Sequence, residues 1–366
     1  MTTDNTRRAV RRELEAAATA GLHVSAFTTR TLALLHRVVR FDACCLATVD
    51  PTTRLITGAV ARGLDESRAA HLFEIEYGRG DVSAYRALAQ TNTRVATLDA
   101  ATNGDPAASL RFDEILKPLG LGHELRVLFS SEGRTWGVAA LMRGTDEKAF
   151  GDDELRSIAT LSETVADGLR ASILVEVSGR AQIVDSVGPA VVVIEESGEP
   201  EMITPAAAAR LVDFPGYVAD RLPDAVLVVV AAARGAGAAG AKLRVRGQSG
   251  AWWVVSATSV TTGSAKAKVV ATVEEARTPD VVPLVVAALG LSARERDVVV
   301  GVLEGRTSGE VADDLGISTH TVNDHLKSIF AKAGVHSRRE LVARVFFEHY
   351  APRIGSPLAT GGWFEE

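Results

Sequence analysis

The spacing of apolar side chains predicts a first domain of mixed helices and strands. Apolar residues recur every three or four positions between Val24 and Val39, which is typical of an amphipathic helix. The runs FDACCLATVD and RLITGAVA follow, separated by Pro51 and threonines, and they predict an antiparallel hairpin. HELRVLFSS and TWGVAALMRG predict a second strand pair, joined at Ser-Glu-Gly-Arg. We therefore expect an α+β domain with an antiparallel sheet over residues 1–178.

A long amphipathic helix closes this domain. It begins near Asp152 and Asp153, whose carboxylates favour the positive end of the helix dipole, and extends to Val177. Its apolar stripe consists of Leu155, Ile158, Leu161, Val165, Leu169 and Ile173. Packing on the domain's own sheet explains this stripe as well as pairing with the same helix of a second copy does. Both alternatives stay open at this point.

A second, smaller α+β domain is predicted over residues 179–276. AVVVIEESGEPEMITPAA has the pattern of a strand, a turn, a strand and a helix. AKLRVRGQSGAWWVVSATSV and AKVVATVEEA predict three more strands, with turns at Gly247 and Gly250. Prolines then interrupt the pattern between Arg277 and Pro283, so we expect a linker at 277–285.

Residues 286–350 have a wholly helical pattern, and residues 351–366 are expected to form a C-terminal tail. The signals for helix starts and ends divide this region into four short helices. These signals are Ser292 with Glu295, Gly305, Ser308, Gly316, Ser318, Gly334 and Ser337. Four short helices with a sharp turn at Gly316 predict a helix-turn-helix bundle, in which the third helix enters the major groove of DNA.

Composition narrows the class of protein. With 366 residues, 46% of them hydrophobic, the chain can form two or three buried cores. Its two cysteines, Cys44 and Cys45, are neighbours, so neither a disulfide framework nor a thiolate zinc site is expected, and the protein is predicted to be cytoplasmic. The longest apolar run, Ala225 to Ala233, is too short to span a membrane.

Net charge at first argues against a nucleic-acid partner. The whole chain carries −6, and phosphates attract proteins through Lys and Arg. The helical region, however, is divided: residues 292–317 carry −3 and residues 318–344 carry +3. The basic half is the half that would face DNA, so the local charge favours a DNA-binding function.

The helical region resembles the DNA-binding module of LuxR-type (GerE-type) bacterial transcription regulators, without a gap. The matching positions include Leu291, Arg294, Glu295, Gly305, Glu310, Ala312, Leu315 to Ser318, Thr321, Val322, His325, Leu326, Ile329, Phe330, Lys332, Gly334, Val335, Ser337 and Arg338. By order of elements, residues 1–178 resemble a GAF domain and residues 179–276 a PAS domain. This resemblance implies sensor domains that respond to an unidentified small molecule or partner, and homodimerisation.

Helix geometry and the resemblance suggest which residues would contact DNA. Val322, Leu326, Ile329 and Phe330 are expected to face the core of the helical region. The resemblance implies base reading at Asn323, Asp324 and Lys327, although Asp324 is equally explained as an intrahelical partner of Lys327. The residues expected to contact phosphates are Thr319, Thr321, Lys332, Arg338 and Arg339. His325 is expected to pack between helices.

No catalytic or metal site is predicted, and no cofactor. GAGAAG at 235–240 has the letters of a dinucleotide fingerprint, but a strand pattern follows it instead of a helix, so we expect a flexible loop. His23, His36, His71 and His123 lack ligand spacing. The adjacent cysteines favour buried packing over a redox role. Paired hairpins also argue against a phosphoacceptor receiver domain, which needs a parallel sheet.

The predicted function is a sequence-specific DNA-binding transcription regulator whose N-terminal sensor domains respond to a ligand or partner. Double-stranded DNA is the expected partner. Two alternatives remain: a protein-interaction scaffold whose helix-turn-helix no longer binds DNA, and a small-molecule enzyme. The first is supported by Asp324 and the acidic half of the helical region, whereas no nucleophile, base or metal set supports the second.

Overall fold

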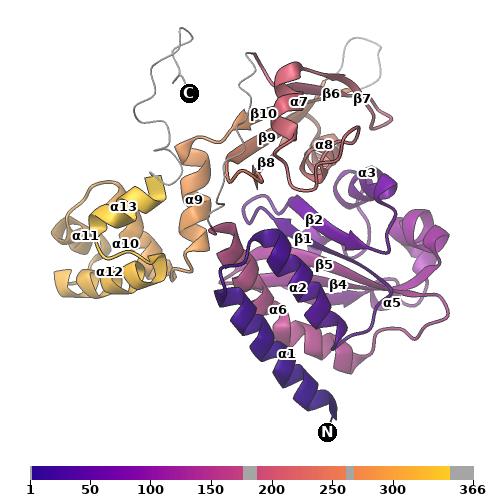
Figure 1. The fold of residues 1–366 in the computed structure, drawn as a ribbon, viewed down its shortest axis with the longest axis horizontal. Coiled ribbons are helices and arrows are strands. Elements are labelled where there is room, and N and C mark those ends of the chain that lie inside the picture. Colours follow the sequence, from indigo (N-terminus) through magenta and orange to yellow (C-terminus); the bar gives the residue numbers. More distant parts are fainter. Residues whose placement is uncertain (1, 176–187, 261–267, 347–366) are drawn as a thin grey trace. The chain divides into compact units, whose positions relative to one another are not determined.

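A computed structural model describes residues 2–175, 188–260 and 268–346 of the chain (Figure 1). The chain divides into two compact units, Met1–Glu275 and Ala276–Glu366. The described part of the first unit contains two antiparallel sheets, and that of the second is helical. The predicted fold class, two α+β domains followed by a helical domain, is confirmed.

The first sheet has five antiparallel strands in the order β2-β1-β5-β4-β3. Both predicted hairpins are present, because Cys45 pairs with Ala61 and Leu125 pairs with Leu141. The strands are β1 (Ala43–Val49), β2 (Ile56–Arg62), β3 (Val95–Thr97), β4 (Leu121–Ser131) and β5 (Arg134–Gly144). The two hairpins join through the central pair β1 and β5, so the sheet is continuous.

Three helices cover one face of this sheet: α1 (Thr2–Thr19), α2 (Val24–His36) and α6 (Asp152–Ile173) (Figure 1). Most of the predicted apolar stripe of α6 is buried here, including Ile158, Val165 and Leu169. Gly168 lets the ring of Phe27 contact the α6 backbone, where a Cβ would collide with it. The stripe is therefore covered within its own domain, as one of the two alternatives predicted.

Short helical segments cover the opposite face of the first sheet. They all come from the stretch between the two hairpins, on either side of β3, and none exceeds six residues. They are η1 (Glu66–Arg68), α3 (Ala69–Phe73), η2 (Glu74–Arg79), α4 (Tyr85–Gln90), α5 (Leu98–Ala101), η3 (Pro106–Ala108), η4 (Phe112–Leu116) and η5 (Lys117–Leu119). This face encloses the polar cluster described below.

The second sheet repeats the strand order of the first, β7-β6-β10-β9-β8, and is also antiparallel. The predicted strand, turn, strand, helix and three further strands are present, but an additional helix over Asp224–Ala236, which was not predicted from the sequence, precedes the last three strands. The elements are β6 (Val191–Ile194), β7 (Pro200–Ile203), α7 (Pro205–Leu211), β8 (Ala241–Arg246), β9 (Trp252–Val260) and β10 (Lys268–Glu275).

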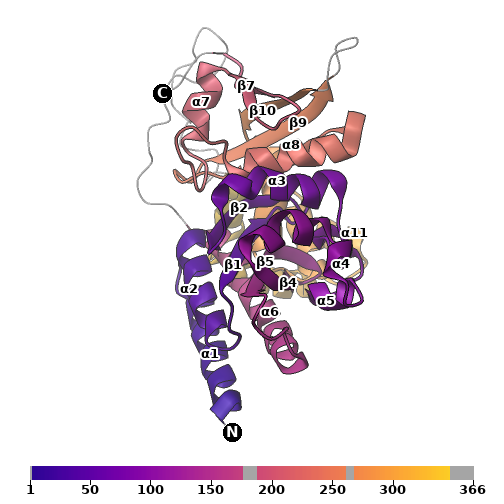
Figure 2. The ribbon, with the colours of Figure 1, turned by 90° about the vertical axis from the view of Figure 1, so that its right-hand side faces the viewer.

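The apolar helix α8 (Asp224–Ala236) lies between the two sheets and joins their cores (Figure 2). Val226, Val229 and Ala233 are fully buried in a single cluster to which both sheets contribute. Gly235 allows α8 to approach η2 closely, since a Cβ there would lie 2.5 Å from the carbonyl oxygen of Tyr77. The two α+β domains thus share one hydrophobic core.

Among the described residues, no helix is both long and apolar enough to cross a membrane.

The prediction of a flexible loop at 235–240 is wrong. Gly235 and Ala236 are the last residues of α8, and η6 (Gly237–Ala239) continues the chain as a single helical turn into β8. The small residues serve close packing and a tight turn, with Gly237 and Gly240 at positive φ.

The second unit contains α9 (Thr278–Ala288), α10 (Ala293–Leu303), α11 (Ser308–Leu315), α12 (Thr319–Ala333) and α13 (Arg338–Phe346). Most of the segment predicted as a linker, 277–285, is helical, because α9 covers it from Thr278 onward. Pro279 lies in the first turn, where a helix needs no N–H, and Pro283 forfeits one backbone bond. Burial of Val281, Leu284 and Val285 compensates for that loss. The predicted tail at 351–366 lies outside the described residues.

The two cysteines lie next to each other on β1, and both are free thiols. Burial raises the pKa of both, that of Cys45 to about 12. Thiols of this kind are protonated and weakly nucleophilic at neutral pH. In the described ranges, no group of three or more His, Cys, Asp and Glu side chains is placed to hold a metal ion.

Candidate nucleic-acid interface

Helix caps and a left-handed glycine build the turn between α11 and α12. Thr307 caps α11 in a reciprocal pair with Glu310, whose carboxylate accepts the Thr307 backbone N–H at 2.7 Å. Gly316 ends α11 with φ at 62°, a conformation that favours glycine. Ser318 then caps α12 by accepting the Thr321 backbone N–H at 3.1 Å. These contacts fix the direction in which α12 leaves the turn.

Glu295 holds α12 against α10. Its side chain is buried, and its carboxylate accepts hydrogen bonds from the backbone N–H of Ser292 and the hydroxyl of Ser328, both at 2.6 Å. Lys332 donates a third bond at 2.7 Å. The sequence predicted Glu295 only as a capping partner of Ser292. Its second role joins residues 37 positions apart, and no local spacing signals such a contact.

The face of α12 opposite its core contacts carries the predicted base-reading residues. Val322, Leu326 and Ile329 are buried in the domain, whereas Asn323 and Lys327 are exposed. His325 is half-buried, which agrees with packing between helices. The exposed face of α12 therefore presents the amide of Asn323 and the ammonium group of Lys327.

Asp324 is engaged within α12. Its carboxylate accepts a hydrogen bond from Lys327 at 3.1 Å and lies 3.5 Å from the His320 ring. The Lys327 contact and the nearby His320 lower the pKa of Asp324, so it is ionised at neutral pH. The intrahelical pairing expected as one alternative is thus present. The same hydrogen bond keeps the Lys327 ammonium group close to the surface of α12.

The five residues expected to contact phosphates differ in their surroundings. Thr319, Thr321 and Arg339 are exposed, and Arg338 is half-buried. Lys332 forms the ion pair with Glu295, with its own side chain 39% exposed. Its ammonium group therefore stabilises the packing of α12 on α10, and a phosphate contact would compete with this ion pair.

Replacing Glu295 with Gln tests the anchoring of α12. Burial disfavours the charged form of Glu295, but bonds from Lys332, Ser328 and Ser292 outweigh it and lower its pKa to about 2. A pKa lowered on folding gives stability that is present above the unfolded value near 4.3 and lost as the pH falls towards 2. We expect Glu295→Gln to reduce protection of α12 amides by up to about 3 kcal/mol at pH 7, with the difference from the native chain shrinking below pH 4.

Hydrogen exchange of the α12 amides in the full chain measures this effect. Glu310→Gln is the matched control, because Glu310 also forms a capping box but is exposed, and within the described ranges its carboxylate bonds to Thr307 alone. Because it is exposed to solvent, its loss should reduce protection of the α12 amides much less than the loss of Glu295. Equal losses from the two variants would show that Glu295 acts only as a cap.

The helical unit is similar to known regulators in sequence. Residues 289–345 match the family described as "Bacterial regulatory proteins, luxR family". The chain is 42% identical over 66 residues to the HTH-type transcriptional activator RamA of Corynebacterium glutamicum, a match that covers 18% of this chain and 21% of RamA. It is 46% identical over 56 residues to the monoamine regulon transcriptional regulator of Klebsiella aerogenes, covering 15% of this chain and 25% of that protein.

The chain thus spans only about a fifth to a quarter of the length of these curated relatives. Among solved structures, the GAF domain of an Acinetobacter phosphoenolpyruvate-protein phosphotransferase aligns with 50% of this chain and 96% of its own, at 13% identity and a TM-score of 0.33. Both sequence relatives are transcription regulators by name. Residues 289–345 therefore form a helix-turn-helix domain of the luxR family of bacterial regulatory proteins.

Proposed function

We propose that this protein is a sequence-specific, DNA-binding transcription regulator without catalytic activity. The observation that carries the proposal is the exposed face of α12 with Asn323 and Lys327, on a helix held by Ser318 and Glu295, within a domain that matches the luxR family. Asn323 can bond to adenine and Lys327 to guanine in the major groove. The surrounding phosphates would be contacted by Thr319, Thr321, Arg338 and Arg339.

The two N-terminal domains, GAF-like and PAS-like, are proposed to receive the signal, which is a ligand or a protein partner in the cytoplasm. The shared core around α8 supports this role, because it gives a change of packing in one domain a direct route to the other. The acting form is proposed to be a homodimer, since two recognition helices then occupy half-sites about one DNA turn apart. Analytical ultracentrifugation of the full chain with and without DNA tests the dimer.

Capture of genomic DNA fragments by the full chain, followed by sequencing, tests sequence-specific binding. With a site in hand, we expect Lys327→Ala to weaken binding by about 5- to 100-fold and to relax the preference at one base pair. Arg339→Ala should weaken binding to all sequences and reduce the slope of log affinity against log salt by about one. Arg86→Ala, which removes an exposed charge on α4, is the control and should change neither.

A protein-interaction scaffold is the second candidate function. The Asp324–Lys327 pair favours it, because the pair puts a carboxylate where phosphates approach and engages the ammonium group of Lys327. If no DNA sequence is enriched by capture and Asp324→Asn does not restore binding, the scaffold replaces the regulator as the proposed function.

A further inference from the structure

A polar hollow of about 240 Å³ lies at one end of the first sheet, where its strands turn. The β1–β2 turn and the β4–β5 turn meet at this end, because β5 pairs with both β1 and β4. The segment just before β3 and Glu163 of α6 complete the wall. The described residues that line this hollow do not overlap with those of the apolar space between the sheet and the short helices, so the two are separate places.

Three arginines from three different segments line the polar hollow. Arg54 comes from the β1–β2 turn, Arg94 immediately precedes β3, and Arg134 begins β5. Within the described part of the chain, neither Arg54 nor Arg134 has an ion-pair partner, whereas the Arg94 guanidinium lies 3.8 Å from the Glu163 carboxylate. Glu132 is the second acid of the lining. Three cations and two carboxylates thus give the lining a net charge of +1.

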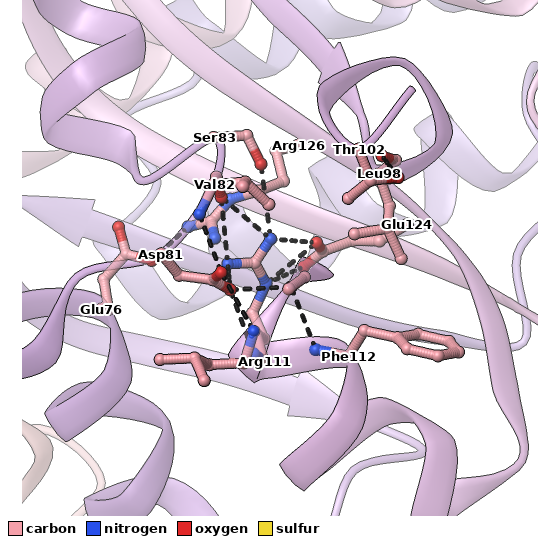
Figure 3. A network of polar contacts seen from close by, with 12 residues as sticks. Glu76, Asp81, Val82, Ser83, Leu98, Thr102, Arg111, Phe112, Glu124 and Arg126 are labelled. Atoms are coloured by element: carbon pink, nitrogen blue, oxygen red, sulfur yellow. Dashed lines mark hydrogen bonds and ion pairs between the residues drawn. The ribbon is translucent and has the colours of Figure 1, made fainter. Parts of the chain in front are cut away.

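Arginines in the interior of the same domain are compensated by acids instead (Figure 3). Arg111 donates to both Asp81 and Glu124, and Arg126 donates to Glu76. The guanidinium groups at the polar hollow carry like charges that repel one another unless an anion lies among them. Because the chain supplies too few acids there, the arrangement favours an anion that comes from solution.

The backbone of the two turns is strained where it carries charged side chains of the lining. Arg54 has a φ of 60° and Glu132 a φ of 51°, which is the left-handed region that glycine and asparagine tolerate best. Glycine or asparagine would form either turn with less strain. Strained positions of this kind cluster at ligand sites, where the side chain is needed for binding. The turn geometry therefore supports a binding role for this end of the sheet.

Three guanidinium groups suit a phosphate group better than a carboxylate. A carboxylate has two oxygens in one plane, and a single guanidinium fork can satisfy both of them. The phosphate of a monoester has three terminal oxygens in a tetrahedral arrangement, so it can accept hydrogen bonds from several arginines at once. The convergence of arginines from separate segments thus indicates a phosphate.

The rest of the lining and the size of the hollow restrict the remainder of the ligand. Asn92, Thr93, Ser130 and Thr135 contribute amide and hydroxyl groups to the wall, so the uncharged part of the ligand is expected to carry hydroxyls. A cavity of about 150 Å³ holds benzene, so a hollow of about 240 Å³ admits about ten non-hydrogen atoms. A short polyol esterified with phosphate has this size and chemistry.

We propose that the polar hollow binds a small hydroxylated phosphate monoester, with its phosphate held by Arg54, Arg94 and Arg134. Arg54 and Arg94 are exposed and Arg134 is half-buried, so the ligand reaches them from solvent. The inference goes beyond the proposed function, because binding at this site requires no DNA.

The site adjoins the contact between the two α+β domains. Pro51 lines the hollow, and its neighbours Asp50 and Thr52 accept hydrogen bonds from Arg244 of β8 at 2.6 and 2.7 Å. A bound phosphate monoester therefore touches the turn that holds β8 of the second domain.

Isothermal titration calorimetry of the full chain without DNA tests the site, with glycerol 1-phosphate as the probe. We expect saturable binding with a dissociation constant on the order of 100 µM for a ligand of this size. Glycerate, which carries a carboxylate in place of the phosphate ester, should bind at least about tenfold more weakly. Inorganic phosphate should also bind more weakly than the ester, because it lacks the hydroxylated part.

Three variants locate the binding. Arg54→Ala and Arg134→Ala should each weaken it by about 10- to 100-fold, as expected for loss of a hydrogen bond between charged groups. Arg62→Ala is the matched control, since Arg62 is exposed at the opposite end of β2, and it should change the affinity less than about twofold. Glu163→Gln should strengthen binding by about 2- to 5-fold, because it removes a charge that repels the phosphate and releases Arg94.

Binding of glycerate as tight as that of glycerol 1-phosphate would overturn the phosphate class, and equally tight binding of inorganic phosphate would overturn the ester. No saturable binding of any probe, or equal losses from Arg62→Ala and Arg54→Ala, would overturn the site. Circular dichroism checks the fold of each variant, and a gain of affinity in Glu163→Gln cannot result from a damaged fold. Because all titrations are made without DNA, failure of this site is distinguishable from failure of the proposed function.

Discussion

Replacing Arg111 with Met is expected to lower the free energy of unfolding of the first unit by about 3–5 kcal/mol. The Arg111 side chain is 2% exposed and donates to Asp81 at 2.9 Å and to Glu124 at 2.7 Å, and both carboxylates are buried as well. Met has a similar length and fills the space, but it carries no charge. Two buried carboxylates would then remain without the cation that compensates their charge. Removing one partner of a buried ion pair is strongly destabilising because it leaves the other charge buried and unpaired.

Urea unfolding followed by tryptophan fluorescence measures the loss, since Trp136 is buried in this domain. Arg79→Met is the matched control: Arg79 donates two hydrogen bonds to Glu114, both at 2.7 Å, but is 40% exposed. That variant should lose about 1 kcal/mol or less. Adding Glu124→Gln to Arg111→Met should recover part of the stability. It removes one of the two buried carboxylate charges that repel each other once Arg111 is gone. If Arg111→Met loses no more than Arg79→Met, the buried cluster does not stabilise the fold.

The sequence predicts what local spacing determines and misses what only tertiary contacts create. Alternating and three-to-four spacings were sufficient for both hairpins and for α6, because each element there buries one regular face. The stretch between the hairpins folds into helical segments of six residues or fewer, too short for a period to be recognised. The buried cluster of Arg111, Asp81 and Glu124 lies within and beside that stretch, and charged residues are ordinarily expected outside a core.

The same distinction applies to the DNA-facing site. Caps at Ser292 and Ser318 and the turn at Gly316 are set by neighbouring residues, and the structure has them as predicted. The outward position of Asn323 follows from the helical period. The ion pair of Lys332 with Glu295 depends on how α10 and α12 pack, so the sequence offered only the phosphate role for this lysine.

Replacing Asp50 with Asn is expected to produce the second large loss, about 3–5 kcal/mol, at the contact between the two α+β domains. The Asp50 side chain is fully buried and accepts Nε and Nη2 of Arg244 at 2.8 and 2.6 Å, as well as the Arg244 backbone N–H at 3.1 Å. Asp50 follows β1 in the first sheet and Arg244 lies on β8 in the second. Asn preserves the shape of the side chain but removes the charge and one of the two acceptor oxygens.

Glu66→Gln is the control, because Glu66 joins the same two domains by a bond with Arg221 at 2.9 Å but is 64% exposed. It should cost about 1 kcal/mol or less. For Asp50→Asn we expect the urea transition of the first unit to move to lower concentration without dividing in two. The reason is that α8 still buries Val226 and Val229 in the core shared by both sheets, and this apolar contact keeps their unfolding cooperative. Two separate transitions would instead show that the Asp50–Arg244 pair, and not α8, makes the two domains unfold together.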